Sequence, residues 1–364
     1  MRIAQIAPLY ESCPPKLYGG TERIVSYLTE ELVRQGHEVT LFASGDSETA
    51  ATLVPSCEMA LRLNPAIRDA IPYHIIAIDQ VMRRADEFDV LHFHIDMLHF
   101  PLIRAFADRS VTTLHGRLDL PDLQPFYQAF PEIPLISISN DQRRPMPGCV
   151  TWAGTVHHGL PRDLLPFSAR PQDGYLAFLG RISPEKRPDR AIEIAARAGR
   201  RLKIAAKVDK ADQAYWDEKI GPLVASHDNV EYIGEINEHQ KADFLGNASA
   251  LLFPIDWPEP FGLVMIEAMA CGTPVIAMPC GSVPEVIEDG VSGFIVDDLG
   301  AAVEAVWRLP ELDRSTVRAT FDRRFSAERM ASDYVEIYRS LPGVRREAAR
   351  LQAVEDAPVL AAVA

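Results

Sequence analysis

Short apolar runs alternate along the chain with stretches whose apolar residues recur every three or four positions. In the first such unit, residues 3–8 are mostly apolar, apolar residues recur every four positions between residues 24 and 32, and residues 39–43 are mostly apolar again. Strand-sized runs joined by helix-sized periodic stretches are typical of parallel βα units. We therefore predict two buried strands joined by a helix that has Thr21 as its N-cap and ends at Gly36.

The same alternation continues through the rest of the chain with one interruption. Between residues 159 and 174 the periodicity fades and three prolines occur, which is typical of a linker between domains. A helix should begin at Pro188 and end near Gly199. Further strands are expected at residues 90–94, 110–114 and 135–139 before the linker, and at 175–179, 202–207, 230–233, 250–254, 274–278 and 293–296 after it.

This pattern predicts an α/β fold with two doubly wound, Rossmann-like sheets that face one another across a cleft. We expect an N-terminal domain over residues 1–165, a C-terminal domain over residues 166–325, a last helix over residues 326–341 and a flexible tail over residues 342–364. Ligands of such sheets bind beyond the carboxyl ends of the strands. The loops that follow the strands are therefore where functional residues should be sought.

Composition and charge narrow the class of protein. The chain has 364 residues and a formal net charge of −14, which argues against nucleic acid as a partner. Its five cysteines never occur as Cys-x-x-Cys, which indicates reduced thiols. The apolar stretch 262–283 contains Gly272, Pro274 and Pro279, so it predicts a buried helix and strand and not a membrane span. We expect a cytoplasmic protein with at most weak peripheral contact at the inner face of the cell membrane.

The segment around Glu259 and Glu267 carries the strongest chemical signal. Pro258 and Pro260 hold Glu259 in a rigid loop after a strand, and a helix should begin near Gly262. The free N–H groups of a helix start form an anion site, and a carboxylate inside an apolar helix needs hydrogen-bond donors such as sugar hydroxyls. The segment therefore predicts a site for a nucleotide sugar, the alternative being a helix cap and a buried salt bridge.

A second loop offers positive charge. Arg181 and Lys186 follow a buried strand that ends at Gly180, and an arginine fork beside a lysine suits a diphosphate. The chain contains no Asp-x-Asp, so we expect these two cations, and no metal ion, to stabilise a departing diphosphate. The alternative is a pair of surface salt bridges.

The first domain adds weaker signals. Gly19 and Gly20 precede a helix, where they either admit an anionic ligand or form a turn. His115 ends a buried strand, where it either contacts a sugar or is structural. His94, near the end of the preceding strand, is expected on the acceptor side. Nothing in the sequence supplies the further ligands that would make the histidines a metal site.

Glu285 follows Gly281 in a loop of small residues that joins a strand to a helix in the second half of the chain. It could contact a ligand, on the acceptor side or at the donor, or it could only stabilise its own helix dipole.

Taken together, these residues resemble glycosyltransferase family 4, which comprises retaining enzymes of the GT-B fold. The resemblance extends from Met1 to about Leu341. It is carried by the Gly-Gly loop, the strand-end histidine, the Gly-Arg loop with its lysine and the Glu-x7-Glu segment, in that order. One departure is His158-Gly159, where the family commonly has Asn-Gly; we interpret this position as mainly structural.

The resemblance implies a role for each candidate residue. Arg181 and Lys186 would hold the diphosphate, and Gly19 and Gly20 would approach it from the other domain. His115 would lie beside the anomeric carbon, and the last helix would cross back to the first domain. Glu267 would bind the ribose. Glu259 and the backbone of Phe261, Gly262 and Leu263 would bind the transferred sugar. The backbone around Ile233, Gly234 and Glu235 would bind the base.

The implied activity is metal-independent transfer of a hexose, from a donor of the UDP-glucose or GDP-mannose type, to a hydroxyl of a carbohydrate, lipid-linked or small-molecule acceptor. Alternatives are a GT-B epimerase, a phosphorylase and a catalytically silent protein that binds sugar nucleotides. A dinucleotide-dependent dehydrogenase would need Gly-x-Gly-x-x-Gly after the first strand, and that spacing is absent.

Overall fold

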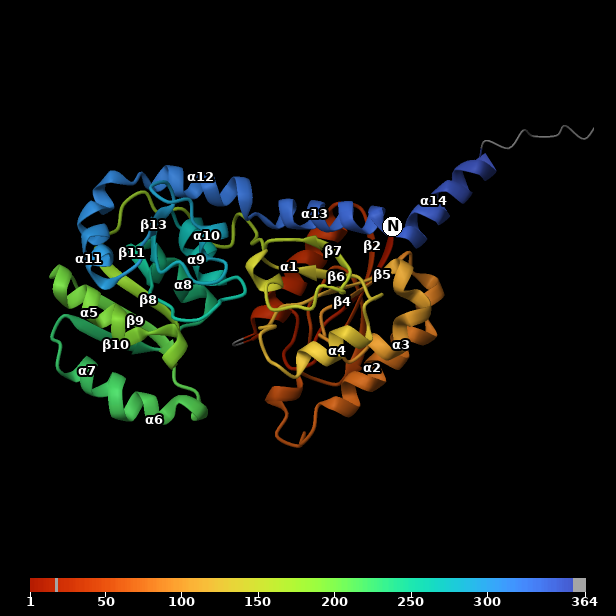
Figure 1. Cartoon of the computed structure of the whole chain (residues 1–364), viewed down its shortest axis with the longest axis horizontal. Helices are drawn as coiled ribbons and strands as arrows, with labels where there is room; N and C mark the ends of the chain where they lie inside the picture. Colours follow the sequence, from red (N-terminus) through yellow and green to blue (C-terminus); the bar gives the residue numbers. More distant parts are fainter. Residues whose placement is uncertain (17–18, 356–364) are drawn as a thin grey trace, which may run out of the picture.

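The computed structural model describes residues 1–16 and 19–355. Two parallel sheets form two lobes that lie side by side (Figure 1). The first sheet has the strand order β3 (Thr52–Cys57), β2 (Glu38–Ser44), β1 (Arg2–Ile6), β4 (Val90–Phe93), β5 (Ser110–Thr113), β6 (Leu135–Ser137) and β7 (Trp152–Thr155). The second has the order β10 (Val230–Gly234), β9 (Leu202–Lys207), β8 (Tyr175–Arg181), β11 (Ala248–Phe253), β12 (Val275–Ala277) and β13 (Gly293–Ile295).

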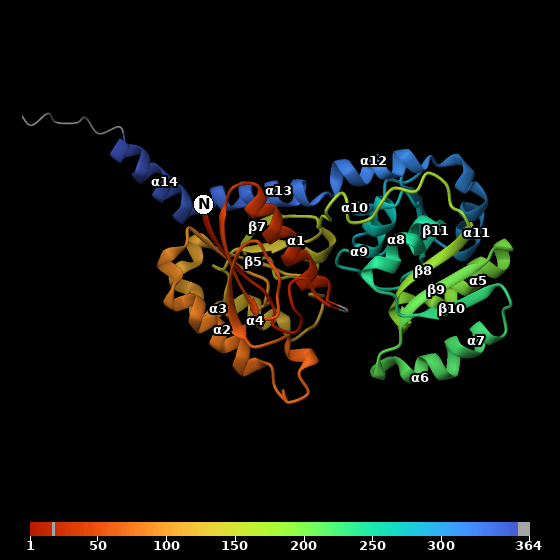
Figure 2. The same cartoon turned by 180° about the vertical axis from the view of Figure 1, so that it is seen from behind.

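Helices cover both sheets, as the predicted α/β fold requires (Figures 1 and 2). The first lobe contains α1 (Gly20–Arg34), α2 (Ile71–Arg83), α3 (Phe100–Ile103) and α4 (Leu123–Ala129). The second contains α5 (Pro188–Ala198), α6 (Gln213–Tyr215), α7 (Gly221–Ala225), α8 (Glu238–Gly246), α9 (Leu263–Ala270), α10 (Val283–Val286), α11 (Leu299–Arg308) and α12 (Arg314–Arg324). Helix α5 follows the prediction: Pro188 is its first residue and Gly199 caps its C-terminus in the left-handed conformation.

Helix α13 (Ala327–Ser340) returns from the second lobe to the first and packs on α1. Ser326 caps it by accepting a hydrogen bond from the backbone N–H of Arg329, as serine does at helix starts. Its buried face repeats every four residues through Met330, Tyr334 and Tyr338. These side chains belong to one apolar core that continues into both sheets, so burial of α13 holds the lobes together.

Three sequence predictions need correction. Thr21 is not an N-cap: α1 begins at Gly20 with Gly19 as the cap, so Thr21 lies in the first turn. Strands β3 and β7 were not predicted: Ser56 is the one buried residue of β3, and no residue of β7 is buried. The expected tail begins with helix α14 (Pro342–Glu355), which packs near Asp108 through Arg346; residues 356–364 lie outside the described residues.

Candidate active site

A cleft of about 1080 Å³ separates the two lobes and is lined by both. Loops that follow β1, β4 and β5 form one wall, and loops that follow β8 and β11 contribute to the other. This is the edge at which parallel sheets bind ligands. The cleft contains most of the residues singled out from the sequence: Gly19, Gly20, His94, His115, Arg181, Lys186, Glu235, Glu259, Phe261, Gly262, Leu263 and Glu267.

The start of α9 lies in the wall of the second lobe. Gly262 is its N-cap and has a φ of 76°, a left-handed conformation that a residue with a side chain adopts at a cost. The helix begins at Leu263, and Leu263 and Val264 line the cleft. This arrangement gives the cleft an anion-binding end of a helix.

Glu259 and Lys186 form an ion pair beside this helix start. Trp257 Nε1 also donates a hydrogen bond to Glu259 Oε2 at 3.0 Å, and the Lys186 ammonium lies 5.0 Å from the centre of the Trp257 ring. Gly281 packs closely against this loop: a Cβ atom added to Gly281 would lie 2.3 Å from the Glu259 backbone nitrogen. The loop is thus held rigidly with one carboxylate and one cation facing the cleft.

Glu267 is buried one turn inside α9, where its carboxylate accepts a hydrogen bond from Lys241 Nζ at 2.6 Å. Lys241 also pairs with Glu238, and Glu238 pairs across the cleft with Arg23 of α1 at 2.5 Å. Glu267, the residue predicted to bind the ribose, thus belongs to a network of two cations and two carboxylates that spans both lobes. Sequence analysis missed Lys241, Glu238 and Arg23, which lie on two distant helices without any local motif.

Arg181 ends β8 within reach of three carboxylates. Its guanidinium lies 3.0 Å from Glu185, 3.6 Å from Asp212 and 3.7 Å from Asp209, and its side chain is 32% exposed. An exposed pair of this kind contributes little to stability. Arg181 therefore remains available to a ligand in the cleft, although the surface salt bridges considered from the sequence are also present.

Of the two glycines of the first lobe, Gly20 faces the start of α9. An added Cβ atom at Gly20 would lie 3.7 Å from Leu263 Cδ1 in the other lobe. At Gly19 an added Cβ would lie 2.9 Å from Pro15 Cβ and 3.0 Å from Glu11 Cγ. Gly20 thus lies next to the start of α9, whereas Gly19 packs closely against Pro15 and Glu11 of its own lobe.

His115 and His94 meet in the wall of the first lobe. His115 Nε2 lies 2.9 Å from His94 Nδ1, and His94 Nε2 lies 2.8 Å from Gln5 Oε1. Because the Gln5 carbonyl oxygen only accepts, His94 Nε2 carries the proton and His94 Nδ1 accepts from His115. Burial lowers the pKa of His115 to about 3, and burial together with neighbouring histidines lowers the pKa of His94 well below its usual value.

This hydrogen-bonded chain continues to α13. Gln5 Nε2 donates to the Tyr338 hydroxyl at 3.1 Å, and His92 Nδ1 lies 2.6 Å from the same oxygen. On its other side, His115 stacks on the ring of His158 with 5.3 Å between ring centres. The residue interpreted as mainly structural, His158, therefore lines the cleft beside His115.

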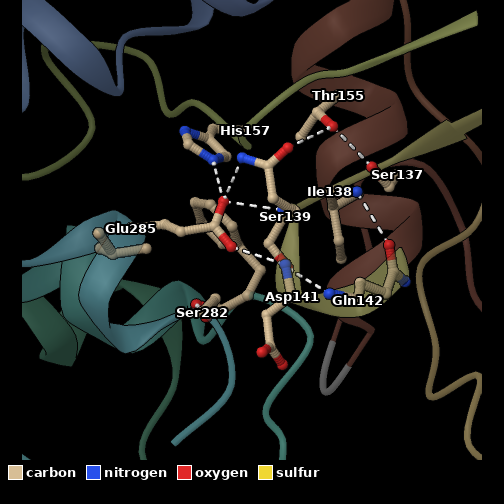
Figure 3. A network of polar contacts seen from close by, with 12 residues as sticks. Ser137, Ile138, Ser139, Asp141, Gln142, Thr155, His157, Ser282 and Glu285 are labelled. Atoms are coloured by element: carbon tan, nitrogen blue, oxygen red, sulfur yellow. Dashed lines mark hydrogen bonds and ion pairs between the residues drawn. The ribbon is translucent and has the colours of Figure 1, made fainter. Parts of the chain in front are cut away.

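Glu285 lies outside the cleft lining and joins the two lobes instead (Figure 3). Its carboxylate accepts hydrogen bonds from the backbone N–H groups of Asn140 and Asp141 at 2.8 and 2.7 Å, and it lies 3.2 Å from His157 Nε2. Burial alone would raise the pKa of Glu285, but the hydrogen bonds from His157, Asn140 and Asp141 lower it to about 2. The structure gives Glu285 a connecting position and not one on the acceptor side of the cleft.

The expected base-binding segment is only partly in the cleft. Ile233 and Gly234 end β10 outside the lining, whereas Glu235 and the two residues that follow, Ile236 and Asn237, belong to it. The bend at Gly234, with a φ of 77°, turns the chain into the cleft only after the strand has ended.

Two features are absent from the described ranges, 1–16 and 19–355. Within them, no three His, Cys, Asp or Glu side chains are grouped so that they could hold a metal ion. Over the same ranges, no helix combines the length and the apolar character that crossing a membrane requires.

Two family models match the chain, one in each lobe. The model described as Glycosyltransferase Family 4 matches residues 18–140, and the model described as Glycosyl transferases group 1 matches residues 166–316. Among curated proteins, the D-inositol 3-phosphate glycosyltransferase of Mycolicibacterium smegmatis is 26% identical over 86% of this chain and 82% of its own length. The phosphatidyl-myo-inositol mannosyltransferase of the same organism is 26% identical over 94% of this chain and 95% of its own length.

Solved structures share the whole architecture. Sucrose-phosphate synthase from Thermosynechococcus elongatus superposes with a TM-score of 0.76 at 20% identity and covers 94% of this chain and 99% of its own. The Anabaena protein HepE, solved in complex with UDP and glucose, has a TM-score of 0.70 at 19% identity and covers 94% and 100%. With the GT-B arrangement of two facing sheets and both family models in chain order, the chain belongs to glycosyltransferase family 4.

Proposed function

We propose that this glycosyltransferase is a retaining enzyme that moves a hexose, without a metal ion, from a nucleotide diphosphate sugar to an acceptor hydroxyl. The observation that carries the proposal is the arrangement at the start of α9. Lys186, Glu259 and the first N–H groups of the helix line the same part of the cleft. Two sugar-binding carboxylates on either side of an anion site fit the order of ribose, diphosphate and sugar in a donor.

In this proposal the donor replaces contacts that the free chain makes within itself. The diphosphate lies against the N-terminus of α9 and forms an ion pair with Lys186 in place of Glu259. Glu259 then accepts hydrogen bonds from the transferred sugar. The ribose hydroxyls donate to Glu267 beside Lys241. Gly20 approaches the diphosphate from the opposite lobe.

The chemical step follows from these positions. The acceptor hydroxyl attacks the anomeric carbon on the face from which the diphosphate leaves, and the leaving phosphate takes the hydroxyl proton. Lys186, Arg181 and the helix N–H groups stabilise the negative charge that develops on that phosphate. No side chain needs to form a covalent bond to the sugar. The neutral ring of His115 lies beside the reacting carbon.

UDP-glucose and GDP-mannose are the donors that we favour. Support comes from relatives: HepE has been solved with UDP-glucose, and a relative of 26% identity is a mannosyltransferase. The test is a thermal-stability panel with UDP, GDP, ADP and their sugars, because a ligand of the folded state raises stability by RT ln(1 + [L]/Kd). The nucleotide that gives the largest shift should also be the one whose sugar is consumed.

A product assay with that donor separates the alternative activities. An epimerase would convert the donor sugar without an acceptor, and a phosphorylase would require inorganic phosphate. A catalytically silent protein would bind a nucleotide but consume no donor even by slow hydrolysis. Slow hydrolysis without acceptor, accelerated by a hydroxyl compound, is the result that we expect.

A further inference from the structure

Asp96 is a carboxylate that the sequence analysis did not single out. It follows β4 by three residues and lines the cleft in the first lobe. The parallel register of β4 and β5 pairs Phe93 with Thr112, so Asp96 and His115 leave the carboxyl ends of neighbouring strands. Asp96 therefore lies on the wall opposite the start of α9, on the side left for an acceptor.

The carboxylate of Asp96 lacks a polar partner within the described part of the chain. No hydrogen bond or ion pair joins it to any residue of the ranges 1–16 and 19–355. The residue is exposed to the cleft, and the protein around the cleft raises the pKa of its carboxyl to about 6. An exposed carboxylate that has no partner within the described residues can accept hydrogen bonds from a ligand in the cleft.

The backbone at Asp96 is also unusual. Its φ is 51°, in the left-handed region that few residues with a side chain adopt outside turns and functional sites. Aspartate and asparagine tolerate this region better than most residues. The conformation is therefore compatible with a carboxylate that is kept in place for a contact to a ligand.

We propose that Asp96 binds a hydroxyl group of the acceptor, and that the acceptor is a polyhydroxy compound, either a polyol or a sugar. This inference rests on the proposed function. One acceptor hydroxyl attacks the donor, and a second donates a hydrogen bond to Asp96. A carboxylate that accepts from a hydroxyl orients the acceptor against the anomeric carbon. His115, at the end of the neighbouring strand, borders the same subsite.

The test compares wild-type enzyme with Asp96→Asn and Asp96→Gly. Asparagine keeps the shape and tolerates the left-handed backbone, and glycine removes any strain, so both variants should fold. Asp79→Asn, on the surface of α2 with its side chain 57% exposed, is the matched control. Transfer from the donor identified by the thermal panel is measured with myo-inositol, D-glucose and n-propanol as acceptors, alongside donor hydrolysis without acceptor.

We expect the polyols, but not n-propanol, to accelerate donor consumption. Both Asp96 variants should lower kcat/KM for the polyols about ten- to a hundredfold, the loss typical of one hydrogen bond to a charged group. Nucleotide-induced stabilisation and donor hydrolysis should stay at wild-type values, as in Asp79→Asn. A purely structural role would lower all of these together.

The outcomes that overturn the inference are distinct from failure of the proposed function. Wild-type transfer rates in both Asp96 variants, equal use of n-propanol, or the absence of acceleration by any polyol would each contradict a polyol subsite at Asp96. If no nucleotide stabilises the wild-type enzyme and no donor is consumed, the proposed function itself fails, and the role of Asp96 fails with it.

Discussion

Lys241 Nζ lies 2.6 Å from Glu267 Oε1 in a part of the cleft where both side chains are nearly buried. Lys241 contacts one oxygen of the Glu267 carboxylate. The second oxygen remains for the ribose of a donor. A buried carboxylate of this kind is stable only with a partner. Lys241 thus holds the Glu267 carboxylate in place in the free chain.

The first prediction concerns this pair. Glu267→Gln should lower nucleotide affinity about tenfold, because the amide is a weaker acceptor for ribose hydroxyls. Lys241→Met should instead lower the free energy of unfolding by about 1–3 kcal/mol, since it leaves a buried carboxylate unpaired. Urea unfolding and nucleotide titration of both single variants and the double variant measure the two effects. Nucleotide affinity unchanged in Glu267→Gln would exclude the ribose role.

Lys186 should act mainly on the transition state. Lys186→Ala removes a cation from the leaving phosphate, and turnover should fall a hundredfold or more, about 2.7 kcal/mol or more of transition-state stabilisation. The change is measured as the rate of donor consumption at saturating donor. Lys210→Ala, an exposed lysine outside the cleft lining, should retain the wild-type rate. A folded Lys186→Ala enzyme with unchanged turnover would remove this residue from the mechanism.

Tyr338 should affect the tautomers of His94 and His115 in the cleft through its hydrogen bond with Gln5. Tyr338→Phe removes the hydroxyl that contacts both Gln5 and His92. Leaving buried polar groups unpaired should cost about 1–3 kcal/mol in unfolding free energy. Because Gln5 then has one anchor fewer, His94 and His115 should lose their fixed tautomers, and kcat should fall more than nucleotide affinity.

The imidazole ¹⁵N shifts of His94 and His115 report the tautomers directly. Tyr73→Phe, at a half-buried position on α2, serves as the control for loss of a tyrosine hydroxyl. Unchanged shifts in Tyr338→Phe would show that α13 does not set the state of His115.

Glu285 predicts a pH dependence of stability. Its pKa falls from the ordinary 4.5 to about 2 on folding, so the folded state favours the charged form. The stabilisation is therefore fully present above about pH 5 and is lost as the pH falls toward 2. The difference in melting temperature between wild type and Glu285→Gln should shrink over this interval, whereas Glu193→Gln, an exposed helix residue, should follow wild type. A difference independent of pH between 2 and 5 would contradict this account.

The sequence was sufficient for the fold because the buried strands of a parallel sheet are short apolar runs. Ile3, Val90 and Val111 belong to such runs, and their strands were predicted within a residue or two. Strand β3 lacks that pattern, because only Ser56 of its six residues is buried. The start of α9 was predictable for a different reason: Gly262 stands between a proline-bounded loop and an apolar helix.

Residues joined only by the tertiary structure could not be predicted in the same way. Lys241 and Glu267 are 26 positions apart on different helices, and Arg23 meets Glu238 only when the lobes face each other. The sequence placed Glu285 correctly where a strand is followed by a helix. Its hydrogen-bond partners, however, come from the other lobe. Asp96 had a usable signal, since it is a carboxylate just beyond a buried strand.

The central claim is that a diphosphate binds at the start of α9 beside Lys186 and Arg181. A crystal structure of the enzyme with UDP or GDP, chosen by the thermal panel, tests it most directly. The claim predicts the diphosphate against the backbone N–H groups of Leu263 and Val264, with Lys186 turned from Glu259 toward it. A nucleotide bound elsewhere, with the pair of Lys186 and Glu259 intact, would contradict it.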